Sequence, residues 1–525
     1  MGYWNIYFFA KLGLFYSGFI GFHWLSNLAF AITLALPLAS TRYRLVRMVL
    51  AIPVGLALLY YDSWLPPISR VLSQRGALTG FSGEYLLELL GRFVNIWVIV
   101  ALVLLLVVYL MLRRRLRFAT LTILGILSVP LASLLSGHLA PSVSPRPELA
   151  DKNAPASQIK QIKQELEPTA QLEAFYVAEQ GKRVSFPSMA NSAAPFDVVF
   201  LHVCSLSWDD MDYVGDSNST LLSHFDVVFR RFNTAASYSG PGTLRLFHSN
   251  CGQLVHRKMY EADVTQCNLF HNFEAAGFEV HGLLNHDGHY EQFASLVQGS
   301  SGLGVKLDDN RYAPEAMRSF DDTPVYEDFP LLTEWWKRHE PTGRPRALYY
   351  NTTTLHDGNR VPGVKSRSSL ETFKPRLGKL MSDFDRFITF LEDRGRPVVV
   401  ILMPEHGAAL RGDKVQISGM REIPNPKITL VPAAIKLVGF KGKPGEAPHQ
   451  PLQVDKPVSY FAISTLLADF IADSPFAGTG GKPLAERVQN LPGTPFVSEN
   501  EDVVVIGREK GYLMRSEGTW IDYQP

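Results

Sequence analysis

The sequence lacks an excess of either charge, and it contains few charged residues of any kind. Lys and Arg number 51 against 50 Asp and Glu, and charged residues make up 19% of the 525-residue chain. Nucleic-acid-binding proteins usually carry a basic excess or stripe, so this balance argues against that class. Disordered chains are poor in apolar residues, whereas 46% of this chain is hydrophobic. At about 100–200 residues per domain, we expect two to four folded units.

Charged residues are missing altogether from three long stretches near the N-terminus. Residues 12–41 form a run of 30 without Asp, Glu, Lys or Arg, and residues 93–112 and 118–137 form two runs of 20. A helix of about 20 apolar residues crosses the hydrocarbon core of a bilayer. We expect the first run, with the residues ahead of it, to form two spans that meet near residues 18–21. Each of the other two runs is expected to form one span.

Two placements in this region are less regular. Lys11 falls inside the first expected span, so it is either a side chain reaching for the interface at a helix end or a sign that the helix lies elsewhere. Residues 48–61 form an apolar stretch of only 14 between Arg47 and Asp62. We interpret it as a short fifth span, extended by Arg47 and Trp64. The recurrence of apolar segments argues against a cleaved signal peptide.

Basic residues cluster in two of the short loops between the expected spans. One loop carries three Arg residues between positions 42 and 47, and the other carries four between positions 113 and 117. Because the Lys and Arg of short loops tend to remain on the cytoplasmic side, both loops are expected there. Five spans then place the N-terminus inside and everything after about His138 outside.

Domain boundaries follow from this topology. Residues 1–138 are the expected transmembrane region, with an external loop at residues 62–92 that carries a surface helix around Glu84–Arg92. Residues 139–190 are rich in Pro, Ser, Lys and Gln, and we interpret them as a linker. The alternative for this stretch is an ordered arm packed on the next domain. Residues 191–525 form the expected C-terminal domain.

Short buried runs alternate with amphipathic stretches from about Phe196 onwards. This alternation is typical of an α/β domain with a central, largely parallel sheet. A domain of this size can bury a large core. The expected strands are Asp197–Val203, Arg346–Tyr350, Pro397–Met403 and Lys427–Ile435, the expected helices are Leu370–Leu391 and Tyr460–Ile471, and a C-terminal hairpin is expected over Val503–Ile506 and Gly511–Arg515.

Possible metal ligands follow three of these strands. Cys204 comes directly after the first strand, Glu405 and His406 come after the third, and His356 comes shortly after the second. In open α/β sheets, ligands collect at the carboxyl ends of the strands. Thiol, carboxylate and imidazole groups are the ligands that zinc takes in proteins. Each residue alone has a simpler interpretation, as a buried thiol or a solvated turn, so the coincidence of type and position carries the prediction.

A serine lies where a helix is expected to begin, in Tyr238-Ser239-Gly240-Pro241-Gly242. Proline near the first turn is typical of helix starts, and residues 243–247 can continue the helix. A hydroxyl at that point lies among free backbone N–H groups at the positive end of the helix dipole, which suits a phosphate. The simpler interpretation is an ordinary N-cap. Beside a zinc ion, which lowers the pKa of a bound hydroxyl, Ser239 becomes a candidate nucleophile.

Five motifs, in order along the chain, carry a resemblance to a known family. They are His202-Val203-Cys204-Ser205-Leu206-Ser207-Trp208-Asp209-Asp210, Ser237-Tyr238-Ser239-Gly240-Pro241, Leu355-His356-Asp357-Gly358-Asn359, Pro404-Glu405-His406-Gly407 and Gly419-Met420-Arg421-Glu422-Ile423-Pro424. The sequence resembles the BcsG family of cellulose phosphoethanolamine transferases. Members are inner-membrane proteins with a periplasmic catalytic domain of the alkaline-phosphatase superfamily. The resemblance covers most of the chain, including the five expected spans.

The resemblance implies one zinc ion with four protein ligands, and three further residues that line the site. The implied ligands are Cys204, Ser239, Glu405 and His406, and the lining residues are Tyr238, His356 and Arg421. Ser239 would also act as the nucleophile. Arg421 can hold phosphate oxygens through its planar fork. His356 can donate to those oxygens or move a proton to the attacking or departing oxygen.

The implied reaction is a two-step transfer. Phosphatidylethanolamine from the outer leaflet donates phosphoethanolamine to Ser239, and a glucose C6 hydroxyl of nascent cellulose then attacks the phosphoenzyme. Subunits of a cellulose synthase complex are the implied partners, at a bacterial inner membrane. Two alternatives remain open. One is a phosphoethanolamine transferase or phosphodiesterase acting on lipid A or another periplasmic glycan, and the other is a non-catalytic scaffold of the cellulose synthase complex.

The two cysteines that the metal site does not use are Cys251 and Cys267. They can pair without remainder in the oxidising compartment that the topology predicts. Such a loop would contribute roughly 3 kcal/mol in the chain-entropy model. The alternative is two free buried thiols.

Two further groups of side chains have simple interpretations beside more specific ones. A second metal could be bound by His281, His286 and His289, although a polar loop is the simpler interpretation. Sugars could stack on Trp335, Trp336 and Tyr290, although a position in the core or an interface is the simpler interpretation.

Overall fold

The fold is that of a computed structural model, and it contains two compact units. The structure describes residues 2–17, 19–37, 39–63, 81–92, 96–136, 156–261, 265–300, 307–339, 343–366, 368–413, 415–440, 450–478, 481–501, 503–516 and 518–525. The first unit covers Met1–Arg75, Leu87–Leu149 and Gly412–Ser418, and the second covers Gly76–Leu86, Ala150–Arg411 and Gly419–Pro525. A short piece of the expected external loop, Gly76–Leu86, therefore belongs to the second unit.

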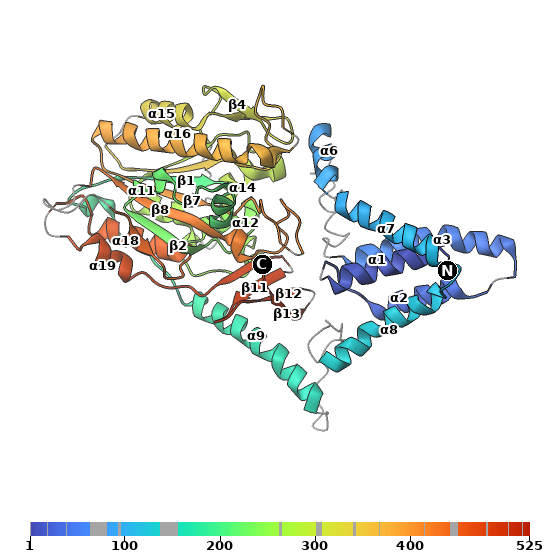
Figure 1. Cartoon of the computed structure of the whole chain (residues 1–525). Helices are drawn as coiled ribbons and strands as arrows, with labels where there is room; N and C mark the ends of the chain where they lie inside the picture. Colours follow the sequence, from blue (N-terminus) through green and yellow to red (C-terminus); the bar gives the residue numbers. More distant parts are fainter. Residues whose placement is uncertain are drawn as a thin grey trace. The chain divides into compact units, whose positions relative to one another are not determined.

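Five apolar helices occupy the places where spans were expected (Figure 1). They are α1 (Trp4–Tyr16), α2 (Trp24–Ala35), α3 (Thr41–Asp62), α7 (Ile96–Leu112) and α8 (Phe118–Ser136). Among the described residues, α3 alone is long and apolar enough to cross a membrane by length and composition. The number of five spans is therefore not confirmed by the helices themselves. Trp64, the expected flank of the short span, lies outside the described residues.

Lys11 lies within α1, and neither explanation expected for it is correct. Its side chain is 1% exposed, and its ammonium pairs with the carboxylate of Asp62 at 2.5 Å. The same nitrogen donates to Asn27 Oδ1 at 2.8 Å. The sequence argument treated Asp62 as the end of a span and Lys11 as an isolated charge. Their pairing across two helices removes the need for either to reach water.

A seven-stranded sheet forms the centre of the second unit, in the order β3-β6-β1-β7-β8-β2-β9 (Figure 1). Every strand runs parallel to the others except β8, which is antiparallel to both of its neighbours. The prediction of an α/β domain with a largely parallel sheet is thus confirmed. The strands are β1 (Asp197–Val203), β2 (Val227–Asn233), β3 (Glu279–Leu284), β6 (Arg346–Thr352), β7 (Val398–Pro404), β8 (Leu430–Val438) and β9 (Leu452–Val454).

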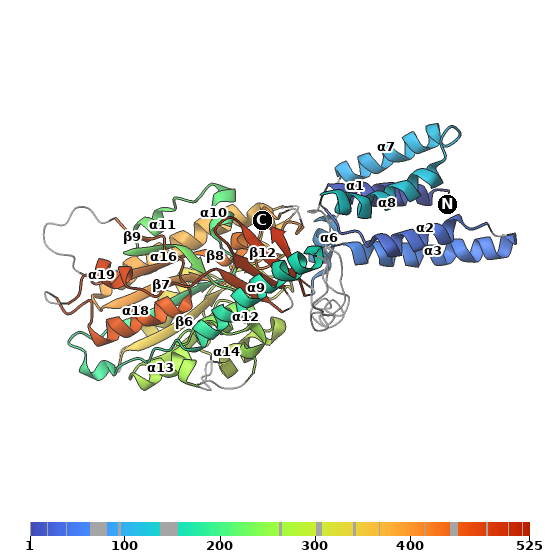
Figure 2. The same ribbon diagram turned by 90° about the horizontal axis from the view of Figure 1, so that it is seen from below.

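Helices cover both faces of this sheet (Figures 1 and 2). α15 (Asp328–Arg338) and α16 (Phe373–Arg394) lie on one face, and α12 (Ser239–Phe247), α13 (Leu269–Ala275) and α18 (Tyr460–Ala472) lie on the other. All seven residues of β1 are buried, because its alternate side chains enter the two cores in turn. In this arrangement the long apolar strands are explained by burial on both faces.

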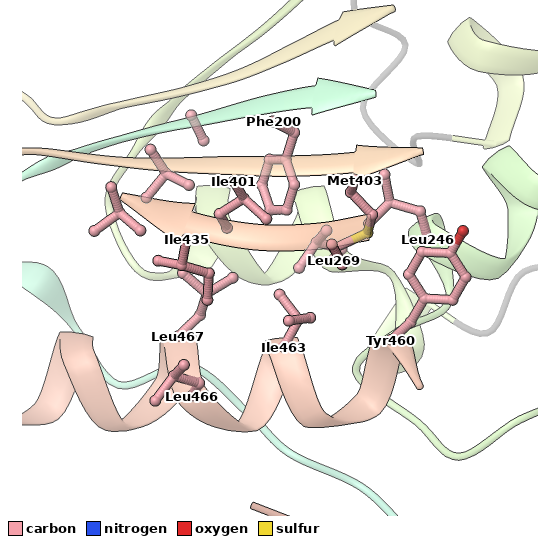
Figure 3. Close-up of a cluster of buried hydrophobic side chains, with 14 of the residues drawn as sticks. Phe200, Leu246, Leu269, Ile401, Met403, Ile435, Tyr460, Ile463, Leu466 and Leu467 are labelled. Carbon is pink, nitrogen blue, oxygen red and sulfur yellow. The ribbon is translucent and has the colours of Figure 1, made fainter. Parts of the chain in front are cut away.

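The two cores use residues that the sequence marked as apolar. Figure 3 shows α18 directing Ile463 and Leu467 toward Phe200 and Ile401 of the sheet. On the other face, Trp335 is 0% exposed, and its neighbour Trp336 is also buried. The simpler interpretation of these two tryptophans, as core residues, is confirmed.

The structure describes the expected linker from residue 156 onward, and most of that part is helical. α9 (Ala156–Gln180) buries Leu172 and Phe175 in a cluster with Val504 and Leu513 of the C-terminal sheet. That sheet contains the expected hairpin and consists of β10 (Val497–Asn500), β11 (Val503–Gly507), β12 (Tyr512–Ser516) and β13 (Thr519–Tyr523). For these residues the alternative interpretation, an ordered and packed arm, is correct. The polar composition of the stretch as a whole hid the two side chains that enter the core. Residues 137–155 lie outside the described residues.

Shorter elements complete the described chain. The surface helix expected around residues 84–92 is present as α6. These elements are α6 (Gly83–Arg92), α10 (Trp208–Val214), α11 (Thr220–Ser223), α14 (Phe293–Ser300), α17 (Pro426–Thr429), α19 (Leu484–Gln489), β4 (Glu315–Arg318) and β5 (Pro324–Tyr326).

Candidate metal centre and catalytic site

The predicted site residues gather at the edge where the parallel strands end. Cys204 follows β1, and Glu405 and His406 follow β7, which pairs with β1. Ser239 begins α12, after β2. Because β8 runs antiparallel, the residues that precede it reach the same edge, and Arg421 is among them. The sheet order therefore explains how distant parts of the sequence meet.

The four predicted ligands lie within contact of one another. Ser239 Oγ is 3.2 Å from Cys204 Sγ and 3.3 Å from His406 Nε2. Cys204 Sγ is 3.9 Å from His406 Nε2, and Glu405 Oε2 is 3.8 Å from the same nitrogen. Zinc bonds of about 2.0–2.3 Å in a tetrahedron place neighbouring ligand atoms roughly 3.3–3.6 Å apart. The observed separations bracket this value.

The hydrogen bonds around these ligands leave donor atoms directed at a common point. His406 Nδ1 donates to the carbonyl of Gly407 at 2.8 Å, which leaves the lone pair of Nε2 facing Ser239 and Cys204. Glu405 Oε2 is buried without a hydrogen-bond partner in the described part of the chain. An orphaned buried carboxylate oxygen is costly unless a cation completes it. The donor set and its orientation therefore fit a metal ion of the zinc class.

Burial shifts the pKa of each ligand toward its neutral form. Loss of solvation, helped by the Glu405 charge, raises the pKa of Cys204 to about 12, and loss of solvation raises the pKa of Glu405 to about 7. The same burial, together with the charge of Arg421, lowers the pKa of His406. A bound cation would reverse the first two shifts by stabilising thiolate and carboxylate.

Ser239 is the first residue of α12, as the sequence predicted. Its neighbour Tyr238 is the N-cap residue in extended conformation, and Gly242 N–H donates to the Tyr238 carbonyl at 2.9 Å. The helix dipole and the free N–H groups of the first turn therefore face the same space as Ser239 Oγ. A phosphoryl group bonded to that oxygen would be stabilised by both.

Arg421 and Tyr238 form the adjoining wall. The guanidinium of Arg421 lies 5.5 Å from the centre of the Tyr238 ring and donates to Ser205 Oγ at 3.2 Å. Tyr238 in turn donates its hydroxyl to Glu422 Oε1 at 2.7 Å. Arg421 Nε is buried without a hydrogen-bond partner among the described residues. The guanidinium of Arg421 therefore keeps one N–H donor without an acceptor among these residues, and this donor is available to an anion.

His356 is held as a neutral imidazole. Its Nδ1 donates to the backbone carbonyl of Asp357 at 2.6 Å, so Nε2 carries the lone pair. Burial, helped by the positive charge of Arg421, lowers the pKa of His356 to about 4. The structure therefore favours one of the two predicted roles. A neutral imidazole whose other nitrogen is occupied accepts a proton, and it cannot donate one first.

A second layer that the sequence analysis did not assign orients Glu405. Asn351 Nδ2, at the end of β6, donates to Glu405 Oε1. Asn351 Oδ1 accepts from His286 Nε2 at 2.9 Å, and the tautomer follows because Gly288 N–H donates to His286 Nδ1. His202 Nδ1 lies 3.4 Å from Glu405 Oε1. His202 stood in a quoted motif and His286 in the group of three histidines, but the contact of Asn351 left no sequence signal.

The turn after His406 is fixed by Asp210, which explains the Ser207-Trp208-Asp209-Asp210 motif. Ser207 and Asp210 form a capping box at the start of α10. Asp210 also accepts from the N–H groups of Ala408 at 2.7 Å and Leu410 at 3.1 Å. The residue before Ala408 must be glycine, because a Cβ at Gly407 would lie 2.8 Å from Asp210 Oδ2. One carboxylate thus holds the loop that carries the predicted metal ligand.

Residues 81–86, ahead of and within α6, contact the loop that carries His356. Tyr85 donates its hydroxyl to Asp357 Oδ2 at 3.1 Å. Arg360 donates to Glu84 Oε2 at 2.7 Å and to Ser82 Oγ at 3.1 Å. Gly358, at φ +81°, allows this approach, since a Cβ there would lie 2.9 Å from the Tyr85 ring.

Aromatic rings extend this contact to His356. Phe81 packs on the rings of Tyr290 and Phe320, at centroid distances of 6.1 and 5.5 Å. Phe320 lies 4.8 Å from the His356 ring. Tyr290 is therefore an interface residue beside the site, in keeping with the simpler of its two interpretations.

The structure also shows the positions of the two remaining cysteines and of the three histidines that could have formed a cluster. Cys251 and Cys267 form a disulfide directly after α12. His281, His286 and His289 do not form one cluster, because His286 contacts Asn351 and His281 contacts Asp308, while His289 is exposed. The polar-loop interpretation fails for His281, which lies within β3.

Comparison with known proteins connects these motifs to one family over the length of the chain. The family model "Cellulose biosynthesis protein BcsG C-terminal domain" matches residues 151–520, and the model "Cellulose biosynthesis protein BcsG N-terminal domain" matches residues 4–131. This chain belongs to the BcsG family. The cellulose biosynthesis protein BcsG of Salmonella typhimurium is 37% identical to it, over 99% of this chain and 96% of the relative. The BcsG protein of Escherichia coli is 36% identical, with the same coverage.

Solved structures are more distant from this BcsG-family chain. A protein in the alkaline phosphatase superfamily from Vibrio parahaemolyticus is 14% identical, with a TM-score of 0.45 over 66% of this chain and 86% of that one. The integral membrane lipooligosaccharide phosphoethanolamine transferase A from Neisseria meningitidis is also 14% identical. Its TM-score is 0.41, over 88% of this chain and 94% of that one.

Proposed function

We propose that this chain transfers phosphoethanolamine from phosphatidylethanolamine to glucose C6 hydroxyls of nascent cellulose. The observation that carries the proposal is the position of Ser239 Oγ, 3.2 Å from Cys204 Sγ and 3.3 Å from His406 Nε2 at the first residue of a helix. A nucleophilic hydroxyl among metal ligands and helix N–H groups suits transfer of a phosphoryl group. The family name, cellulose biosynthesis protein, supports cellulose as the acceptor.

In the first step Ser239 Oγ forms a bond to the phosphorus of the lipid headgroup. The bond between phosphorus and the glycerol oxygen breaks, and diacylglycerol departs. His356 Nε2 accepts the Ser239 proton and returns it to the departing oxygen, as its neutral form allows. Arg421, with its unsatisfied Nε, holds the non-bridging oxygens.

In the second step the C6 hydroxyl of a glucose residue attacks the same phosphorus. Its proton passes to His356 Nε2, the bond from phosphorus to Ser239 Oγ breaks, and Ser239 recovers a proton. The product is a phosphodiester between ethanolamine and the glucan. His356 serves as base first and acid second in each half, which requires one imidazole and no further titrating group.

The proposed cofactor is a single zinc ion, held by Cys204, Ser239, Glu405 and His406. It would supply a Lewis acid that lowers the pKa of the Ser239 hydroxyl and polarises the phosphoryl group. The support is the donor set, the tautomer of His406 and the orphaned oxygen of Glu405.

The proposed location is a bacterial inner membrane, crossed five times, with the second unit in the periplasm. Support comes from the charge-free sequence runs, the Arg-rich loops and the apolar helix α3. A membrane anchor would keep the site near a lipid donor and near cellulose synthase subunits. Reporter fusions after His138 test the orientation. With the N-terminus in the cytoplasm, a reporter that is active only in the periplasm works there only if an odd number of spans precedes it.

The test is intact-protein mass spectrometry on the detergent-solubilised full chain after incubation with phosphatidylethanolamine. We expect a mass gain equal to one phosphoethanolamine group, together with release of diacylglycerol. Ser239→Ala should show neither, whereas Ser223→Ala, an exposed control, should show both. Zinc content measured on the same samples reports whether a variant has lost its metal or only its nucleophile.

The acceptor is tested in a second stage with the loaded enzyme. Cello-oligosaccharides should discharge the adduct and gain a phosphodiester at C6, visible by phosphorus NMR. Discharge by lipid A, and not by glucan, would move the acceptor to that lipid. Bound zinc without adduct would favour a phosphodiesterase of another donor, and the absence of both would favour a scaffold.

A further inference from the structure

A second cluster of possible metal ligands lies away from the strand ends. It consists of His281 on β3, Asp308 in the loop after α14, and His339 at the end of α15. β3 is an edge strand, and His281 is paired in register with Leu348, well before the strand ends at Leu284. The residues of the proposed catalytic site lie at the edge where the parallel strands end, so this cluster is a separate place in the fold.

The donor atoms of this cluster have the spacing of ligands around one ion. His281 Nδ1 is 3.2 Å from Asp308 Oδ2, and His339 Nε2 is 3.6 Å from the same oxygen. All three atoms lie within 4.8 Å of one another. Nitrogen and oxygen ligands at about 2.0–2.1 Å from a tetrahedral zinc lie roughly 3.3–3.4 Å apart.

Hydrogen bonds orient His339 and Asp308 toward this common point. His339 Nδ1 donates to the Trp335 carbonyl at 2.9 Å, and its ring stacks on the Trp335 indole at 4.4 Å. The lone pair of Nε2 therefore faces the carboxylate. Trp335 Nε1 donates to Asp308 Oδ2 at 2.8 Å, the kind of outer contact that fixes a ligating carboxylate.

A hydrogen bond accounts for the contact of His281 Nδ1 with Asp308 Oδ2 at 3.2 Å, but it leaves the position of His339 unexplained. In the neutral imidazole of His339 the unprotonated Nε2 faces a carboxylate oxygen at 3.6 Å, so two lone pairs oppose each other. A cation between them removes that repulsion and uses both lone pairs. The side chains of His281, Asp308 and His339 are 21%, 25% and 29% exposed, which leaves room for water to complete the coordination.

We propose that His281, Asp308 and His339 bind a second divalent metal ion of the zinc class, outside the catalytic centre. Two imidazoles and one carboxylate are the ligand types that such ions take. The ion would tie three elements together: the edge strand β3, the loop of Asp308 and the end of α15. Asp308 N–H already donates to Gly282 O at 2.9 Å, so the backbone is held in place for this role.

The test is the metal content of the full detergent-solubilised chain, stripped with chelator, equilibrated with zinc and freed of unbound metal. We expect two zinc ions per chain, one in His339→Gln and one in Cys204→Ala, and none in the double variant. His281→Asn should repeat the result of His339→Gln. His289→Gln, an exposed histidine five residues beyond the strand, is the matched control and should keep two.

Cobalt substitution distinguishes the two sites and reports on folding. The catalytic site should show a thiolate-to-cobalt absorption band, which Cys204→Ala loses while retaining visible bands from one nitrogen- and oxygen-bound cobalt. His339→Gln should keep the thiolate band, which shows that it is folded. Two metals in His339→Gln, or no metal in Cys204→Ala, would overturn the proposal, and either result leaves the transferase proposal to its own test.

Discussion

Two buried polar clusters, one in each unit of this protein, satisfy their charged groups to different degrees. In the first unit, Lys11 donates to Asn27, to the Leu58 carbonyl and to Asp62. Asp62 also accepts from His23 N–H at 3.0 Å and from Asn27 Nδ2 at 2.7 Å. In the second unit, Glu405 Oε2, His202 Nε2 and Arg421 Nε are buried without partners among the described residues.

This difference is the one expected between a structural cluster and a cluster with the proposed catalytic role. A buried charge pair with all its hydrogen bonds made is stable in itself, and removing one partner leaves the other uncompensated. A site that must bind a cation and a phosphate keeps unpaired donors and acceptors until those ligands arrive, and this costs stability. Variants at the Glu405 cluster should therefore reduce activity more than stability, and variants at the Lys11 cluster should reduce stability more than activity.

The largest effect is expected from Glu405→Gln, which should abolish transfer while stabilising the metal-free protein. Loss of a ligand should reduce the transfer rate at least about a thousandfold, because residues that act as a unit fail together. Burial raises the pKa of Glu405 from 4.5 to about 7, so ionisation opposes folding increasingly between these pH values and fully above them. At pH 8 with chelator, the variant should gain roughly 1–3 kcal/mol. Thermal unfolding at pH 5 and pH 8 checks the sign.

Lys11→Met should produce the opposite result at the structural cluster. It leaves the Asp62 charge buried without its cation, which costs about 3–5 kcal/mol of stability. The double variant Lys11→Met/Asp62→Leu should recover most of that loss, because it removes both charges. Thermal unfolding in detergent measures the change. If the double variant loses as much stability as Lys11→Met, the ion pair itself stabilises the helices, and the loss does not come from an uncompensated Asp62 charge.

Asp210→Asn sharpens the comparison inside the catalytic unit. Asp210 is fully satisfied by Ser207, Ala408 and Leu410, so it should behave as a structural residue beside the catalytic ones. Replacing the carboxylate introduces an N–H₂ group among N–H donors and should cost about 1–3 kcal/mol. Asp212→Asn, with an exposed side chain, is the control. Chemical denaturation compares the two variants.

Metal affinity should depend on pH because the site binds cations through groups that are neutral without one. Burial raises the pKa of the Cys204 thiol to about 12, so metal binding releases its proton throughout the neutral range. The dissociation constant for zinc should rise about tenfold for each unit that the pH falls between 9 and 7, and more steeply below 7 as Glu405 is also protonated. Competition with a chromophoric chelator at several pH values measures the slope. A flat profile would contradict the ligand assignment.

The smallest effect is expected from Tyr85→Phe, which removes one hydrogen bond to Asp357. The cost should be about 1 kcal/mol of local stability, with a loss of activity of a fewfold because Asp357 follows His356 directly. Tyr213→Phe, at an exposed position, is the control. Transfer kinetics should show a lower turnover rate for Tyr85→Phe than for Tyr213→Phe. If Tyr85→Phe changes only the unfolding temperature and not the turnover rate, the effect of Tyr85 is purely structural.

Those parts of the fold that depend on local pattern were predictable from the sequence. β1 was predicted with the ends that it has, because a short apolar run over Asp197–Val203 indicates a strand. Ser239 was predicted to begin a helix because Pro241 is favourable in a first turn. The candidate metal ligands were singled out because thiol, carboxylate and imidazole groups coincide at the ends of expected strands.

Features that depend on the order of the strands were not predictable in this way. Arg421 reaches the site because β8 runs against its neighbours, and no local signal encodes that direction. Asn351 looks like any polar residue at the end of a strand, and its contact with Glu405 follows only from the pairing of β6 with β1. Leu172 and Phe175 lie in a polar stretch, and the surface that buries them is formed by the C-terminal sheet.

The contact of Tyr85 with Asp357 matters for how this protein should be produced in the laboratory. A soluble fragment that begins after the expected linker, near residue 151, would omit Tyr85, Glu84 and Ser82. Arg360 would keep its contact with Asp322 and Asp357 its contact with Ser369, but both would lose their partners in residues 81–86. Such a fragment can retain its sheet and its metal ligands and still give rates below those of the intact chain. Kinetic constants for this protein should therefore be measured on the full-length polypeptide.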